Sequence, residues 1–176
     1  MKIYIASDHA GFELKRRLSD FLESENFEVE DLGPTEFNPN DDYPDFVYPL
    51  AQKVALRQAQ GKLDDVGIVI GGSGQGEAIV ANKVKGVRAA VYYGNPSTLR
   101  NSQGRTEQGR SATSSGLEIV KLSKEHNNAN ILSLGARFLT SDQAIEAVKL
   151  WLETKFTSEE RHLRRINKIT QLEAKI

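Results

Sequence analysis

A predicted strand that ends in a run of glycines limits the fold of this chain more than any other feature. Residues 66–70 form a short apolar run typical of a fully buried strand. A helical pattern follows, with Ile79, Val80 and Lys83 at helical spacing. Between them lies Gly71-Gly72-Ser73-Gly74-Gln75-Gly76-Glu77. Glycines let backbone N–H groups approach a ligand and a helix N-terminus favours negative charge, so the stretch predicts a ligand cradle.

Apolar runs alternate with helical patterns along most of the chain. Strands are predicted at residues 2–6, 27–32, 66–70, 87–93 and 131–134. Helices are predicted after residue 11, at 44–61, after residue 76, at 117–124, at 141–152 and from about 158. Such alternation is typical of a five-stranded parallel α/β sheet with helices on both faces. We expect a single domain spanning residues 1–176.

Local signals refine the helix ends. Either Ser7 or Asp8 is expected to cap the first helix, and Lys15 is expected on its polar face. Either Thr140 or Ser141 is expected to cap the fifth. Residues 157–160, Thr-Ser-Glu-Glu, fit a capping box for the last helix. The sheet does not need that last helix, so we expect it to pack on a second subunit.

Residues 95–116 interrupt this alternation. They are polar and contain almost nothing to bury. We expect one long loop here, either mobile or functionally specialised.

Composition excludes several classes of function. With 23 basic and 24 acidic residues, the 176-residue chain has no net field that favours nucleic acid or an anionic membrane. The chain has no cysteine, so disulfides, thiolate metal sites and cysteine nucleophiles are excluded. No apolar run approaches membrane-spanning length, and the N-terminus enters a strand pattern instead of a signal peptide. We expect a cytoplasmic protein.

The glycine-rich stretch does not match the two best-known phosphate motifs. A P-loop needs Lys and then Ser or Thr after its last glycine, where this chain has Glu77 and Ala78. In a dinucleotide fingerprint starting at Gly72, the third glycine is replaced by Glu77. A lone first-turn glutamate is best explained by the helix dipole. Beside a ligand cradle, Glu77 is better interpreted as a general base.

Further polar residues follow predicted strand ends. In a doubly wound sheet, ligands bind beyond the carboxyl ends of the strands. We expect one such edge to be lined by Asp8, His9, Ser73, Glu77, His126 and Arg137. Arg161 and Arg165 share a helix face, which spacing alone favours as a solvated basic face, although two guanidiniums can also clamp a phosphate. Ser73 lacks a nucleophile elbow, and no metal-ligand spacing is present.

Ordered blocks along nearly the whole chain resemble one family, the type B ribose-5-phosphate isomerases and the related galactose-6-phosphate isomerase subunits. The blocks are Ser7-Asp8-His9-Ala10-Gly11, Asp42-Tyr43-Pro44-Asp45, the glycine-rich stretch with Ala81-Asn82-Lys83, Gly86-Val87-Arg88-Ala89-Ala90, His126-Asn127-Asn128-Ala129-Asn130, Leu134-Gly135-Ala136-Arg137 and Arg161-His162-Leu163-Arg164-Arg165. The resemblance implies a three-layer Rossmann-like sandwich. It also implies a dimer or tetramer with shared active sites and no metal or cofactor.

The implied reaction interconverts ribose 5-phosphate and ribulose 5-phosphate through an enediolate. The resemblance implies that Glu77 transfers the proton, that His126 opens the sugar ring, and that Ser73 helps to hold the enediolate oxygen. Backbone groups of the loop would assist Ser73, from Gly72, Gly74, Gln75 and Gly76. Sugar hydroxyls would contact Asp8, Tyr43 and Asn127. The phosphate would bind His9, Arg137, Arg161 and Arg165, some of them from a partner subunit.

The chain departs from the family pattern at two places. Many members carry a cysteine base at the position of Gly71, and this sequence resembles a second branch with glycine there and a glutamate base at the position of Glu77. The stretch at 95–116 is also longer than the usual connection. Two alternatives therefore stay open: an isomerase of a six-carbon aldose phosphate, such as allose or galactose 6-phosphate, and a non-catalytic sugar-phosphate sensor.

Overall fold

The computed structural model describes residues 1–94 and 116–175. The strands are β1 (Lys2–Ser7), β2 (Glu28–Asp31), β3 (Val66–Gly71), β4 (Ala89–Tyr92) and β5 (Ile131–Gly135). The helices are η1 (His9–Gly11, a 3-10 helix), α1 (Phe12–Ser24), α2 (Pro44–Ala59), α3 (Gln75–Ala81), α4 (Gly116–Asn127), α5 (Ser141–Glu153) and α6 (Glu160–Glu173).

All five strands join one parallel sheet, which confirms the predicted architecture. The strand order is β2-β1-β3-β5-β4. In register, Gly67 of β3 pairs with Ile131 of β5, and Gly71 pairs with Gly135. Because every pairing is parallel, the carboxyl ends of the strands meet at one edge of the sheet and the amino ends at the other.

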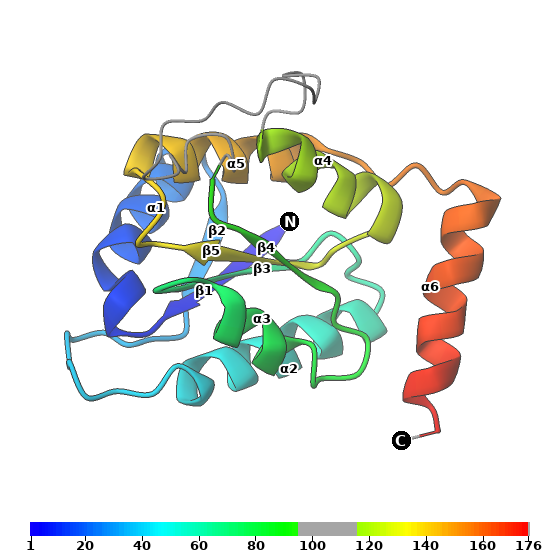
Figure 1. The fold of residues 1–176 in the computed structure, drawn as a ribbon, viewed down its shortest axis with the longest axis horizontal. Helices are drawn as coiled ribbons and strands as arrows, with labels where there is room; N and C mark the ends of the chain where they lie inside the picture. The colour runs from blue at the N-terminus through cyan, green and yellow to red at the C-terminus, as the bar shows by residue number, and fades with distance from the viewer. Residues whose placement is uncertain (95–115, 176) are drawn as a thin grey trace, which may run out of the picture.

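Helices cover both faces of the sheet and make a three-layer sandwich. Figure 1 shows α1, α4 and α5 on one face and α2 and α3 on the other. Successive β1 side chains alternate between two cores: Ile3 and Ile5 pack with α1 and α5, whereas Tyr4 and Ala6 pack with α2. Both cores are apolar, so the sheet is buried on its two faces as a parallel sheet requires.

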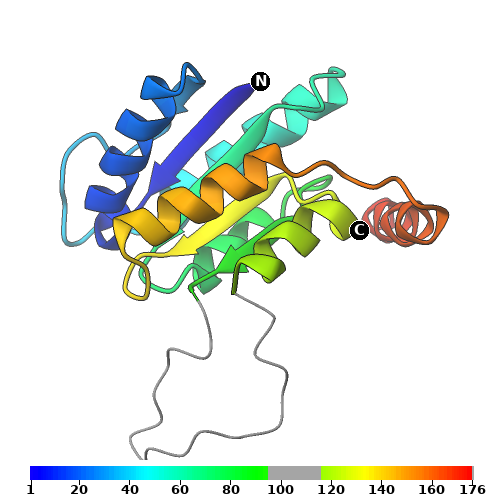
Figure 2. The ribbon, with the colours of Figure 1, turned by 90° about the horizontal axis from the view of Figure 1, so that it is seen from above.

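Helix α6 lies outside the sandwich, beside the end of α4 (Figures 1 and 2). Leu163, Ile169 and Leu172 on this helix are each more than 40% exposed, so much of its apolar surface is uncovered in a single chain. The predicted capping box is wrong. The cap position is Glu159, which makes no side-chain capping bond, and Thr157 instead donates its hydroxyl to the carbonyl of Glu125.

Three other local predictions have different outcomes. Thr140 caps α5 in a capping box with Gln143 as predicted. Asp8 caps the short helix η1, whereas the cap position of α1 is Gly11, which has no side chain to bond. Lys15, however, is only 1% exposed, so its predicted place on a solvent face is wrong. Its ammonium group reaches the end of β2, where it donates to both carboxylate oxygens of Asp31 at 2.7 and 2.6 Å and to the carbonyl of Pro34. These partners offset the cost of burying the charge.

The predicted loop at 95–116 falls outside the described residues, apart from Gly116, which begins α4. Helix α4 extends to Asn127, three residues beyond the predicted end. His126 and Asn127 therefore lie in its last turn and not in a loop. In the described part of the chain, no helix is long and apolar enough to cross a membrane.

Candidate active site

Most of the predicted site residues gather at the carboxyl edge of the sheet. The edge is formed by the ends of β1, β3 and β5 and the segments that follow them. We call this group the carboxyl-edge cluster: Asp8, His9, Tyr43, Gly72, Ser73, Gly74, Gln75, Gly76, Glu77 and Arg137.

The carboxylate of Glu77 fills the space where Gly71 lacks a side chain. A Cβ atom added at Gly71 would lie 1.7 Å from Oε1 of Glu77 and 2.7 Å from Oε2. Glu77 is 4% exposed although it occupies the first turn of α3. Burial raises the pKa of this carboxyl group, and the negative charge of Asp8 raises it further. A carboxylate with a raised pKa is a better proton acceptor near neutral pH than an exposed one.

Asp8 is held rigidly beside this group. Its Oδ1 accepts hydrogen bonds from the backbone N–H groups of Ala10 at 2.9 Å and Gly11 at 3.2 Å. Gly11 is required there, because a Cβ atom would lie 2.5 Å from the carbonyl oxygen of Ile70. The tight turn therefore packs η1 against β3 and brings the Asp8 carboxylate close enough to act on Glu77.

The glycine loop owes its shape to close backbone contacts. Gly74 has φ +76°, a left-handed conformation that favours glycine, and its carbonyl accepts a 2.6 Å hydrogen bond from the buried hydroxyl of Ser133. A Cβ atom at Gly135 would lie 2.8 Å from the carbonyl oxygen of Ser73. The Ser73 hydroxyl accepts from the N–H of Gln75 at 3.3 Å. Strand β5 therefore contacts the glycine loop through Ser133 and Gly135 and helps to fix its conformation.

Two larger side chains flank the loop at its other glycines. The Tyr43 ring occupies the space beside Gly76, where a Cβ atom would lie 2.7 Å from Cζ and 2.9 Å from the hydroxyl oxygen. The Arg137 guanidinium lies beside Gly72, with Nε 3.1 Å from an added Cβ. These glycines therefore admit a phenol and a cation to the rim of the cluster, both suited to a sugar phosphate.

Asp41 contacts this edge through His9 and was not predicted from the sequence. Its Oδ1 accepts two hydrogen bonds from His9, one from the backbone N–H at 3.0 Å and one from ring Nδ1 at 2.7 Å. The ring hydrogen bond to Asp41 is the main cause that raises the pKa of His9, and the charges of Asp8 and Asp41 add to it. Because 32 residues separate His9 from Asp41, no sequence spacing signals the pair.

The remaining predicted residues lie at the opposite edge of the sheet. We call His126, Asn127, Arg161 and Arg165 the amino-edge cluster. His126 precedes β5, so its predicted position beside Glu77 is wrong: a residue that comes before a parallel strand lies at the amino edge. The four residue steps from Gly67 to Gly71 alone span about 13 Å of strand.

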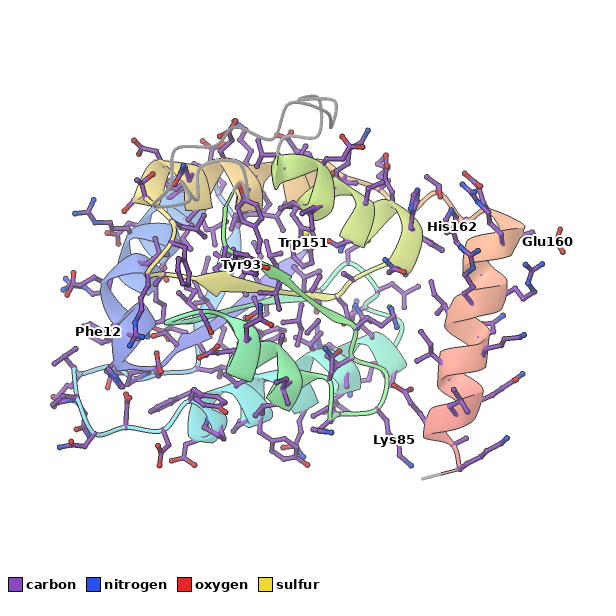
Figure 3. All side chains as sticks on the ribbon, in the orientation of Figure 1. Phe12, Lys85, Tyr93, Trp151, Glu160 and His162 are labelled. Carbon is purple, nitrogen blue, oxygen red and sulfur yellow. The ribbon has the colours of Figure 1, made fainter. Side chains whose placement is uncertain are left out.

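The amino-edge cluster joins the ends of α4 and α6. The rings of His126 and His162 stack with centroids 4.3 Å apart and planes 14° apart. Figure 3 shows His162 on α6, directed at the end of α4. His162 is 2% exposed, and burial and the neighbouring positive groups lower its pKa. Arg161 and Arg165 are both exposed, and Arg161 pairs with Glu159 at 2.7 Å.

Arg88 fixes the turn that carries His126 and Asn127. Its guanidinium donates to the carbonyl oxygens of Asn127 and Asn128 at 2.9–3.0 Å. Asn127 ends α4 and Asn128 is the next residue, so the contact stabilises the helix end and orients the turn that follows.

Metal ligands do not gather in either cluster. Within residues 1–94 and 116–175, no group of three or more His, Asp or Glu side chains could hold a metal ion.

Comparison with known proteins identifies the family. Residues 3–103 and 101–169 match the family model described as Ribose/Galactose Isomerase. The chain belongs to the ribose/galactose isomerase family. Several members are similar over nearly their whole length. The probable ribose-5-phosphate isomerase B of Mycoplasma genitalium is 39% identical over 97% of this chain and 95% of that protein. The ribose-5-phosphate isomerase B of Mycolicibacterium paratuberculosis is 34% identical over 98% and 92%.

Solved structures of family members share the fold. The Mycoplasma genitalium ribose-5-phosphate isomerase B, solved with bound ribulose 5-phosphate, has a TM-score of 0.81 and 38% identity over 99% of this chain and 97% of that one. The ribose-5-phosphate isomerase B of Clostridium thermocellum has a TM-score of 0.78 and 39% identity over 99% of both chains.

Proposed function

We propose that this isomerase-family protein interconverts D-ribose 5-phosphate and D-ribulose 5-phosphate through an enediolate, with Glu77 as the base. The observation that carries the proposal is the buried Glu77 carboxylate in the space left by Gly71. The relatives named above support the choice of substrate, and one of them was solved with ribulose 5-phosphate.

The chemistry needs one proton acceptor and one group of hydrogen-bond donors. Glu77 removes the proton from C2 of the open-chain aldose, and the electron pair moves onto the C1 oxygen to form the enediolate. The Ser73 hydroxyl and the backbone N–H groups of residues 72–76 stabilise the developing oxyanion. Return of the proton to C1, with transfer of the hydroxyl proton between O2 and O1, completes the ketose.

We further propose that each active site combines the carboxyl-edge cluster of one subunit with the amino-edge cluster of another. The two clusters lie at opposite ends of the strands and cannot meet on one small substrate within a single chain. The exposed guanidiniums of Arg161 and Arg165 would bind phosphate, and His126 would assist ring opening. The uncovered apolar surface of α6 supports contact with a second copy.

Mixed oligomers test this arrangement. Glu77→Gln and His126→Ala subunits, each inactive as pure oligomers, should regain about one quarter of wild-type activity when refolded together in equal amounts. About half of the dimers are then mixed, and each mixed dimer holds one intact site of two. The measurement is initial turnover of ribose 5-phosphate. A mixture as inactive as its components would contradict shared sites.

Turnover across a panel of ribose 5-phosphate, allose 6-phosphate and galactose 6-phosphate tests the substrate. The highest kcat/KM is expected for ribose 5-phosphate. A preference for a six-carbon substrate would reassign the specificity but leave the reaction unchanged. Binding of all three without turnover would show a sugar-phosphate sensor instead of an enzyme.

A further inference from the structure

In the described part of the chain, the Asp41 side chain accepts hydrogen bonds from one residue, His9. Its Oδ1 accepts both the backbone N–H and the ring Nδ1–H of His9, at 3.0 and 2.7 Å. The Asp41 side chain is 7% exposed, whereas the His9 side chain keeps 33% of its surface exposed. The carboxylate is therefore buried against the ring, and part of the His9 side chain remains exposed to solvent.

The second carboxylate oxygen of Asp41 makes no hydrogen bond that would stabilise the loop around Asp41. Oδ2 is buried and has no hydrogen-bond partner in the described part of the chain. A buried oxygen without a partner costs stability, and a residue that served only as a turn former would bond the backbone of its own segment. Here Oδ1, the oxygen that has partners, accepts both of its hydrogen bonds from His9.

We propose that Asp41 is a positioning residue that holds the imidazole of His9 in one orientation and in its doubly protonated form, so that Nε2–H is presented to the phosphate of the substrate. This inference rests on the proposed function for the identity of the anion. The chemistry follows from the two ring nitrogens. With Nδ1–H donated to Asp41, Nε2 carries a proton only in the imidazolium ion. A neutral His9 would instead turn a lone pair toward the phosphate.

The charges around His9 support the same assignment. The carboxylates of Asp41 and Asp8 both raise the pKa of His9, and partial burial opposes them. Near neutral pH a larger fraction of His9 is therefore charged than of an unpaired histidine. Phosphate binding should accordingly weaken as pH rises through the raised pKa of His9.

The test is Asp41→Asn, which keeps the shape of the side chain and removes its charge. At pH values between the ordinary histidine pKa and the raised pKa of wild-type His9, we expect KM for ribose 5-phosphate to rise about tenfold, the size of one charge-assisted hydrogen bond, with kcat changed less than about twofold. Well below the ordinary histidine pKa, where the ring is protonated in both proteins, the two KM values should converge. Glu36→Gln, an exposed acid in the same loop, is the matched control and should behave as wild type.

Three further measurements separate positioning from a structural role. NMR titration of the His9 ring, which needs no substrate, should show a lower pKa in Asp41→Asn than in wild type. Asp41→Glu, which keeps the charge, should restore part of the high-pH affinity and remains informative if the asparagine variant does not fold. In a His9→Gln background, Asp41→Asn should leave KM unchanged.

Each result bears on one proposal alone. An equal rise in KM at every pH, or an unchanged His9 titration, would overturn the role of Asp41 while wild-type turnover leaves the proposed function intact. A wild-type protein that neither binds nor converts ribose 5-phosphate would instead overturn the proposed function, and the His9 titration would still decide whether Asp41 holds the charged ring.

Discussion

Glu77→Gln is expected to lower isomerase kcat by a factor of about 10² to 10⁴, the usual contribution of a general base. Glutamine has the same shape and fills the space beside Gly71, but its amide cannot accept the proton from the substrate. KM should change little, because phosphate and hydroxyl contacts remain. The measurement is kcat with saturating ribose 5-phosphate, together with calorimetric binding of the same ligand.

Stability provides an internal control for this variant. Burial raises the pKa of Glu77, so the folded protein holds that proton more tightly than the unfolded chain does. The carboxyl group therefore destabilises the fold progressively as pH rises through its unfolded and then its folded pKa. Glutamine lacks this cost, so Tm near pH 7 should equal or exceed the wild-type value. Glu13→Gln, at an exposed position on α1, should leave both kcat and Tm unchanged. Near-normal turnover in the Glu77→Gln variant would exclude Glu77 as the base.

Gly71→Ala is expected to abolish activity and also to destabilise the protein by about 1–3 kcal/mol, as overpacking of a filled site does. The added Cβ would lie 1.7 Å from Oε1 of Glu77, so the carboxylate must leave its position. Alanine differs from glycine only by this methyl group, so any loss of stability arises from the methyl group itself. Thermal unfolding and turnover measure the two effects separately.

The double variant Gly71→Ala/Glu77→Ala isolates the cause. Removing the carboxylate makes room for the new methyl group, so most of the lost stability should return while activity stays absent. If the double variant is as unstable as Gly71→Ala alone, the conflict lies elsewhere in the loop. Such a result would contradict the packing account of Gly71.

The same contact bears on the family branch with a cysteine at the position of Gly71, which is not the branch that this sequence resembles. A cysteine at position 71 would place its Cβ inside the volume that the Glu77 carboxylate occupies here. In this conformation one chain can therefore hold a cysteine at position 71 or the buried Glu77 carboxylate, but not both. A buried Glu77 carboxylate and a glycine in place of cysteine at position 71 are therefore required by the same packing constraint.

The sequence by itself determined the sheet and the half of the site that follows strand ends. Apolar runs marked the central strands β1, β3 and β5, because burial on two faces demands continuous apolar residues. The glycines around Ser73 marked the loop, because only glycine permits its close backbone contacts and the left-handed Gly74. Glu77 was predicted as a general base because it occupies a position where known phosphate-binding motifs require a different residue.

Only the tertiary structure decided which residues meet. His126 was predicted at the same edge as Glu77, but it lies in the last turn of α4, before β5, and therefore at the other end of the strands. Lys15 was predicted to be exposed, but Asp31 and the carbonyl of Pro34 compensate for its burial. Asp41 was missed because its pairing with His9 spans 32 residues. Periodicity reports how one segment faces its surroundings, whereas an ion pair between distant segments depends on distances that exist only once the chain has folded.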